Sequence, residues 1–94
     1  MVKCAMKEYQ MWDEELNRIY KNIISRLGTE EKELLKKSQR KWIEFRDAEF
    51  EFIDKLYNLP GLLNVVYRYG WKVEIVRERT LRLEKYLNDI NRVK

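Results

Sequence analysis

The sequence predicts an all-α protein, an antiparallel three-helix bundle, from its composition, its apolar spacing and its few helix breakers. The 94 residues include three glycines and one proline, whereas proteins of strands and turns use many of both. Apolar residues recur every three or four positions along three long stretches, as in amphipathic helices. A chain of this length supports one core, so we expect a single helical domain over residues 1–94.

The first helix is expected over residues 4–27 and the second over residues 30–57. Gly28 is typical of the residue after a helix end, and Thr29 is suited to cap the helix that follows. The first helix has one apolar face: Tyr9, Trp12, Leu16, Ile19, Ile23 and Leu27. The second helix has a matching apolar seam: Leu35, Trp42, Phe45, Phe52 and Leu56. Because the junction is short, we expect the two helices to fold back so that these faces meet.

The third helix is expected over residues 61–91, after a break at Asn58-Leu59-Pro60-Gly61. Proline removes an amide donor and keeps the residue before it away from helical angles. The apolar spacing then resumes and keeps its phase: Leu62, Val66, Tyr69, Val73, Val76, Thr80, Leu83, Leu87 and Ile90. We expect this helix to be kinked or broken near Gly70. A kinked or continuous rod is favoured, because one glycine costs a helix only about 1 kcal/mol.

The charges are numerous but mixed. Twenty lysines and arginines alternate with sixteen acidic residues, for a net charge of +4, which is typical of solvated helix faces. Cys4 is the single cysteine, so no disulfide can form within the chain. No apolar run is long enough for a signal peptide or a membrane span. We therefore expect a cytoplasmic protein if the chain is complete, and an envelope or secreted protein if a leader has been removed.

Polar residues run beside the predicted apolar seams. Asp13, Asn17 and Tyr20 form one stripe on the first helix, because they are four and three positions apart. Folding the second helix back on the first predicts an Asp13–Arg46 ion pair and an Asn17–Gln39 contact. Two interpretations are open: these groups fix the register of the helices, or some of them line a binding groove.

Three stretches of the sequence form a recognisable pattern. The first, Asp-x-x-Leu-Asn-x-x-Tyr, consists of Asp13, Leu16, Asn17 and Tyr20. The second, Gln-Arg-x-Trp-Ile-x-Phe-Arg-Asp-Ala-Glu, includes Gln39, Arg40, Trp42, Arg46 and Asp47. The third, Val-x-x-Arg-Thr-x-x-Leu, contains Arg79. Together they resemble the lysozyme inhibitor LprI-like N-terminal domain, formerly a domain of unknown function.

The resemblance implies a small helical bacterial protein of the cell envelope. It identifies candidate partner-binding residues: Asp13, Leu16, Asn17, Tyr20, Gln39, Arg40, Trp42, Arg46, Asp47 and Arg79. Exported members of this family usually carry several cysteines. Here Phe50 stands at one of those positions, and the other falls near Trp71 or Lys72. Aromatic residues in place of a disulfide suit a reducing compartment or an organism that avoids cysteine.

We expect a non-enzymatic protein-binding module, with a lysozyme or a cell-wall enzyme as candidate partner. Many animal lysozymes are strongly basic, so a chain of net charge +4 needs a local acidic patch to approach one. Two patches are candidates: Asp13, Glu14 and Glu15, or Asp47, Glu49 and Glu51. The sequence has no histidine and no cluster of metal ligands, which argues against an enzyme, a metal site or a cofactor.

The alternative is a cytosolic basic helical module that binds nucleic acid or an acidic protein. Its basic residues would be Lys32, Lys36, Lys37, Arg40, Lys41, Arg77, Arg79 and Arg82. Carboxylates alternate with these bases and no nucleic-acid-binding signature is present, which argues against nucleic acid. A homodimer is a further interpretation, closed by residues on the shoulders of the third helix: Tyr67, Trp71 and Tyr86.

Overall fold

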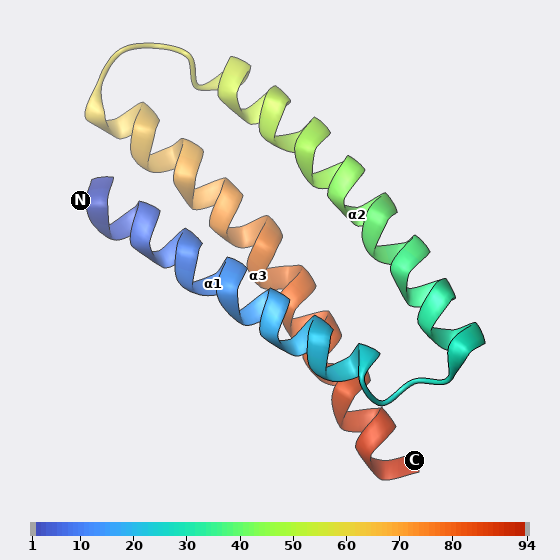
Figure 1. Cartoon of the computed structure of the whole chain (residues 1–94). Coiled ribbons are helices and arrows are strands. Elements are labelled where there is room, and N and C mark those ends of the chain that lie inside the picture. Colours follow the sequence, from blue (N-terminus) through green and yellow to red (C-terminus); the bar gives the residue numbers. More distant parts are fainter. Residues whose placement is uncertain (1, 94) are drawn as a thin grey trace.

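The computed structural model describes residues 2–93 as three helices: α1 (Val2–Ile24), α2 (Thr29–Leu56) and α3 (Leu62–Val93). These residues contain no strand, and successive helices run in opposite directions (Figure 1). The predicted all-α bundle is therefore confirmed. α3 is a single helix that passes through Gly70, so a break at that residue is wrong. Apolar spacing continues on both sides of Gly70 and offsets the small cost of one glycine.

The connections use their glycines differently from the sequence-based expectation. α1 ends at Ile24, and Gly28 is the N-cap of α2, with φ −73° and ψ 173°. Thr29 is thus the first residue of α2 and not its cap. Gly61 follows the predicted break, and its φ of 127° lies in a region that residues with a side chain rarely adopt. The backbone therefore requires a glycine at position 61, whereas the extended angles at position 28 are open to residues with a side chain.

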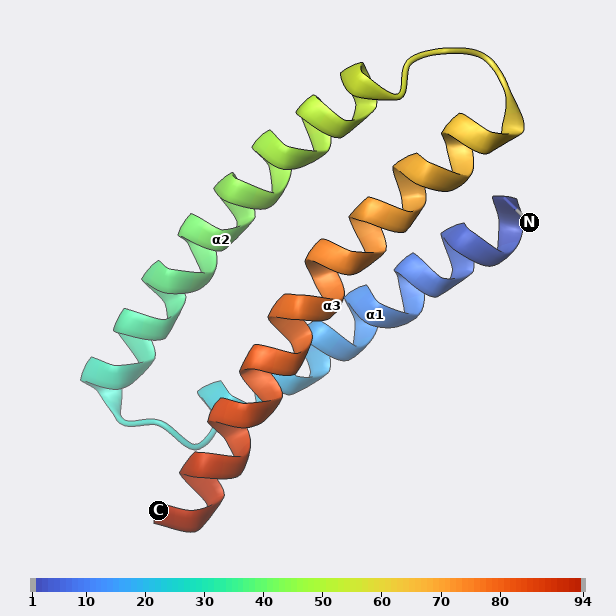
Figure 2. The same ribbon diagram turned by 180° about the vertical axis from the view of Figure 1, so that it is seen from behind.

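The hydrophobic core lies between α1 and α3, which run side by side in both views (Figure 1, Figure 2). Its buried residues are all branched aliphatic residues: Leu16, Ile19, Ile23, Val76 and Leu83. Thr80 is also buried, and its hydroxyl donates to the carbonyl oxygen of Val76 at 2.7 Å. Side chains of this size allow two helices to approach closely.

α2 lies farther from the other helices and contacts them through larger side chains. Trp42 and Phe50 pack against the core from α2, and the Phe50 ring meets the Tyr9 ring edge-on, with centroids 5.9 Å apart. Rings of this size hold backbones apart, and the bundle is flattened, with Cα extents of 50 × 22 × 14 Å. The expected pairing of the first two helices is thus corrected, because α1 packs mainly against α3.

Truncating a core leucine tests this arrangement. Leu83→Ala is expected to lower the free energy of unfolding by about 2–5 kcal/mol, because the fully buried side chain leaves a cavity. Leu34→Ala makes the same chemical change at a residue of α2 that is 61% exposed, and should cost less than about 0.5 kcal/mol. Urea denaturation of the full chain measures both values. Equal losses would contradict a core centred on α1 and α3.

Candidate functional site

Arg79 of α3 is the centre of the polar contacts that hold α2. Its Nε donates to Oε1 of Gln39 at 3.0 Å, and its Nη2 donates to the hydroxyl of Ser38 at 3.3 Å. Its guanidinium carbon lies 6.0 Å from the centroid of the Trp42 ring. Gln39 is only 7% exposed, so this hydrogen bond satisfies an amide that is costly to leave unpaired. Burial lowers the pKa of Arg79, which still carries its charge at neutral pH.

A second group of contacts joins α2 to α3 closer to the turn between them. Nζ of Lys72 lies 2.8 Å from Oδ1 of Asp54 and 5.2 Å from the centroid of the Phe50 ring. The indole Nε1 of Trp71 donates to the hydroxyl of Tyr57 at 3.0 Å. Together with the contacts of Arg79, these interactions set the separation of α2 from α3 at two levels.

Arg46 does not pair as predicted. Its Nη2 lies 2.9 Å from Oδ1 of the neighbouring Asp47, and its guanidinium carbon lies 5.5 Å from the centroid of the Trp42 ring. No Asp13–Arg46 ion pair forms within residues 2–93, so that prediction is wrong. Asp13 instead lies near Tyr9, whose pKa is raised by burial and then by the charge of Asp13.

The ten candidate residues from the sequence do not form one pocket. Five take part in contacts between helices or pack against the core: Leu16, Tyr20, Gln39, Trp42 and Arg79. Arg46 is partly buried and contacts residues of its own helix. Asp13 is half-buried, and three residues are exposed: Asn17, Arg40 and Asp47. The predicted Asn17–Gln39 contact is wrong, because Gln39 bonds to Arg79 instead. Half of the ten candidate residues therefore hold the helices together.

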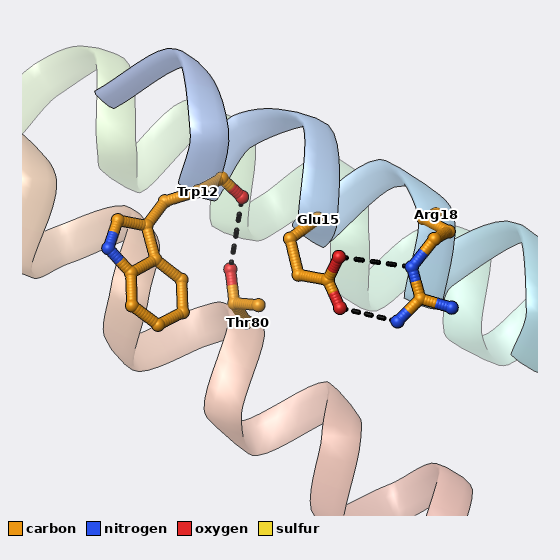
Figure 3. Close-up of polar contacts among 4 residues, drawn as sticks. All are labelled: Trp12, Glu15, Arg18 and Thr80. Carbon is orange, nitrogen blue, oxygen red and sulfur yellow. Dashed lines mark hydrogen bonds and ion pairs between the residues drawn. The ribbon is translucent and has the colours of Figure 1, made fainter. Parts of the chain in front are cut away.

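A polar contact also crosses the interface between α1 and α3. The Thr80 hydroxyl lies 3.5 Å from the backbone carbonyl oxygen of Trp12 (Figure 3). Beside it, Nε of Arg18 donates to Oε2 of Glu15 at 3.0 Å, and this hydrogen bond lowers the pKa of Glu15. Both partners of this second contact belong to α1 and lie at the surface, so it stabilises that helix alone.

A groove of about 370 Å³ opens between α2 and α3. Its apolar walls include Phe45, Phe52 and Leu56 of α2 and Trp71 of α3, each more than half exposed. The sequence predicted that the three α2 residues belong to a buried seam. That prediction is wrong, because α1 packs mainly against α3. None of the described residues of α1 lines the groove, so α1 does not cover these three side chains.

Three carboxylates line the same groove: Glu49 of α2 and Glu74 and Glu78 of α3. Oε1 of Glu74 lies 3.6 Å from Nη1 of Arg77, and both side chains are nearly half exposed. Glu49 belongs to one of the acidic patches predicted from the sequence, whereas Glu74 and Glu78 were not predicted. Their spacing in the sequence could have indicated that they belong to a site. Glu74 and Glu78 are four positions apart and Trp71 lies three positions before Glu74, so the three residues share one helix face.

The shape of the groove suits contact with another macromolecule, because its large apolar side chains stand open to solvent side by side. In the described part of the chain, no group of three or more His, Cys, Asp or Glu residues is placed to hold a metal ion. None of the described helices combines the length and apolarity needed to cross a membrane.

Comparison with known proteins identifies relatives of the chain. The sequence model of a family described as "Lysozyme inhibitor LprI" matches residues 1–83. "Uncharacterized protein YecT" of Escherichia coli (strain K12) is 30% identical over 99 residues, covering 90% of this chain and 61% of the relative. "Uncharacterized protein R02472" of Rhizobium meliloti (strain 1021) is 29% identical over 97 residues, covering 89% and 69%. No solved structure matched the chain.

Removing the buried amide tests the contact of Arg79 with α2. Gln39→Ala is expected to lower the free energy of unfolding by about 1–3 kcal/mol, because the guanidinium loses a buried acceptor. Gln10→Ala, at an exposed position of α1, is the matched control and should cost less than about 0.5 kcal/mol. Amide hydrogen exchange should quicken most in α2 near Ser38 and Trp42. Unchanged exchange there would contradict the role given to Gln39.

Proposed function

This chain belongs to the lysozyme inhibitor LprI family, and we propose that it is a non-enzymatic module that docks a protein partner in the α2–α3 groove. The family match covers 83 of the 94 residues, which confirms the resemblance seen in the sequence. The chain spans 61% of the E. coli relative, and the names of the two relatives assign no activity. The proposed partner, a lysozyme or another cell-wall enzyme, therefore follows from the family description.

The cluster of exposed apolar side chains in one groove supports this proposal. Phe45, Phe52, Leu56 and Trp71 each expose more than half of their surface and line the same hollow. Removing such surface from water favours a complex by about 25 cal/mol per Å² of apolar area, before the entropy cost of association is subtracted. A few large side chains usually dominate the binding energy of an interface, and aromatic residues are prominent among them. In the groove, such side chains come from both α2 and α3.

The basic residues of α2 support the nucleic-acid alternative less well. Nζ of Lys36 lies 3.5 Å from a carboxylate oxygen of Glu33, and Nζ of Lys41 lies 3.4 Å from one of Glu44. Arg79 is engaged by α2 through its hydrogen bonds. A phosphate-binding face needs clustered cations that are free to meet phosphates. These contacts favour docking of a protein.

The class of partner also implies where the protein acts. Lysozymes and cell-wall enzymes work on the bacterial cell wall, so we expect the native protein in the cell envelope. Fractionation of the source cell with an antibody to this chain, with mapping of the native N-terminus, measures this. Recovery in the cytosol alone would remove such enzymes as partners.

Placing a charge in the groove tests the docking site. Phe52→Asp is expected to raise the concentration needed for inhibition of a partner enzyme at least about tenfold, because a carboxylate replaces an apolar anchor. Leu34→Asp is the matched control, because both residues belong to α2 and both are 61% exposed, while Leu34 lies outside the groove. The control variant should inhibit like the wild type.

The measurement is hydrolysis of a cell-wall suspension by a panel of animal and bacterial lysozymes and other cell-wall enzymes. Full activity of every enzyme in a large molar excess of the wild-type protein would remove inhibition as the function. Equal inhibition by the wild type and the Phe52→Asp variant would remove the groove as the docking site.

A further inference from the structure

The charges of the groove indicate the chemistry of its occupant. We propose that the groove takes a basic protein segment, which places an apolar side chain between Phe52 and Trp71. Lysine or arginine side chains on the same segment then meet Glu49, Glu74 and Glu78. This inference rests on the proposed docking function and adds the class of ligand.

Carboxylates stand among the apolar residues on both sides of the groove. On α2, Glu49 comes four residues after Phe45 and three before Phe52, so the three share one helix face. On α3, Glu74 and Glu78 are four residues apart and share a face in the same way. An occupant that buries an apolar side chain in the groove therefore brings its neighbouring residues against carboxylates from two helices.

The groove is locally negative although the chain has a net charge of +4. Its described lining contains three glutamates and no lysine or arginine. Neither Glu49 nor Glu78 forms an ion pair within residues 2–93, and the surface pair of Glu74 with Arg77 is weak. A cation in a partly desolvated groove is attracted more strongly than it is in bulk water. The lining therefore favours a basic occupant over a neutral or acidic one.

Two features restrict the occupant further. Beyond Glu78 the sign of the charge changes, because Arg79 and Arg82 line the adjoining hollow. The basic segment is thereby limited to the stretch of the groove that contains Phe52 and Trp71. A second copy of this chain fits poorly, because groove-to-groove pairing about a twofold axis would set the same glutamates opposite one another.

Two synthetic amphipathic helical peptides test the charge of the occupant. Both carry leucines at identical positions, while the polar face is lysine in one and glutamate in the other. Fluorescence anisotropy with the full chain should show binding of the lysine peptide and none of the glutamate peptide. The combined variant Glu49→Gln, Glu74→Gln and Glu78→Gln should bind the lysine peptide about tenfold more weakly. Added salt should weaken binding of the wild type more than that of this variant.

The matched control carries the same change in net charge at three exposed glutamates outside the groove: Glu8, Glu14 and Glu84. Its affinity for the lysine peptide should equal that of the wild type. Thermal melts followed by circular dichroism verify that both triple variants fold. Phe52→Ala should also weaken binding of the lysine peptide, since it removes the apolar contact without changing the charge.

Equal weakening by both triple variants would reveal a general attraction of charge and overturn the inference. Failure of the wild type to bind the lysine peptide, or binding unaffected by Phe52→Ala, would overturn it as well. Equal affinity for both peptides would overturn the basic specificity and leave the docking groove in place. That result is distinguishable from failure of the proposed function, which appears as enzyme inhibition insensitive to Phe52→Asp.

Discussion

The close approach of α1 to α3 through aliphatic side chains is the constraint on which the remaining structure depends. Ile19 and Ile23 of α1 and Val76 and Leu83 of α3 are almost fully buried. Short branched side chains interlock without holding the backbones apart, so these two helices bury much of each other's apolar face. The third member of the bundle, α2, then packs on a pair of helices whose apolar faces are already largely buried against each other.

The attachment of α2 explains why a surface remains open beside it. Only Gln39 and Ile53 of α2 are buried, and the helix is held by rings and by cations such as Arg79 and Lys72. The side chains that make these contacts are long, so they position α2 without closing the space between it and α3. Apolar side chains that a compact bundle would cover therefore face solvent, and such incompletely covered surface is what a docking protein can bury.

The sequence predicts the helices well because helical periodicity is a local property. Apolar residues three and four apart, with the breaks at Gly28 and at Pro60-Gly61, are sufficient to predict the number and order of the helices. Periodicity gives each helix an apolar face but does not say which helix covers it. The expected Asp13–Arg46 pair failed for this reason, since it assumed that α1 and α2 are closest neighbours.

Side-chain size was the signal for the correct pairing of helices. The apolar face of α2 is rich in aromatic rings, whereas the buried faces of α1 and α3 are mainly aliphatic. Glu74 and Glu78 were not predicted as part of a site, because exposed glutamates on a helix look like ordinary solvated residues. They belong to a groove only because α2 lies opposite them, and the position of α2 relative to α3 cannot be read from a single sequence.

The family pattern and the lining of the groove share two residues, Phe45 and Glu49, and the contact of Arg79 with α2 joins the rest of the pattern to the groove. Arg79 donates to two side chains of α2 through its planar guanidinium and stacks near Trp42, a geometry that lysine does not reproduce. Phe45 lies three residues after Trp42, and Glu78 immediately precedes Arg79, so this contact sets how residues on the two sides of the groove oppose each other. The residues that meet at Arg79 thus position the two walls of the groove, and lining residues outside that contact, such as Phe52 and Glu74, can change without disturbing it.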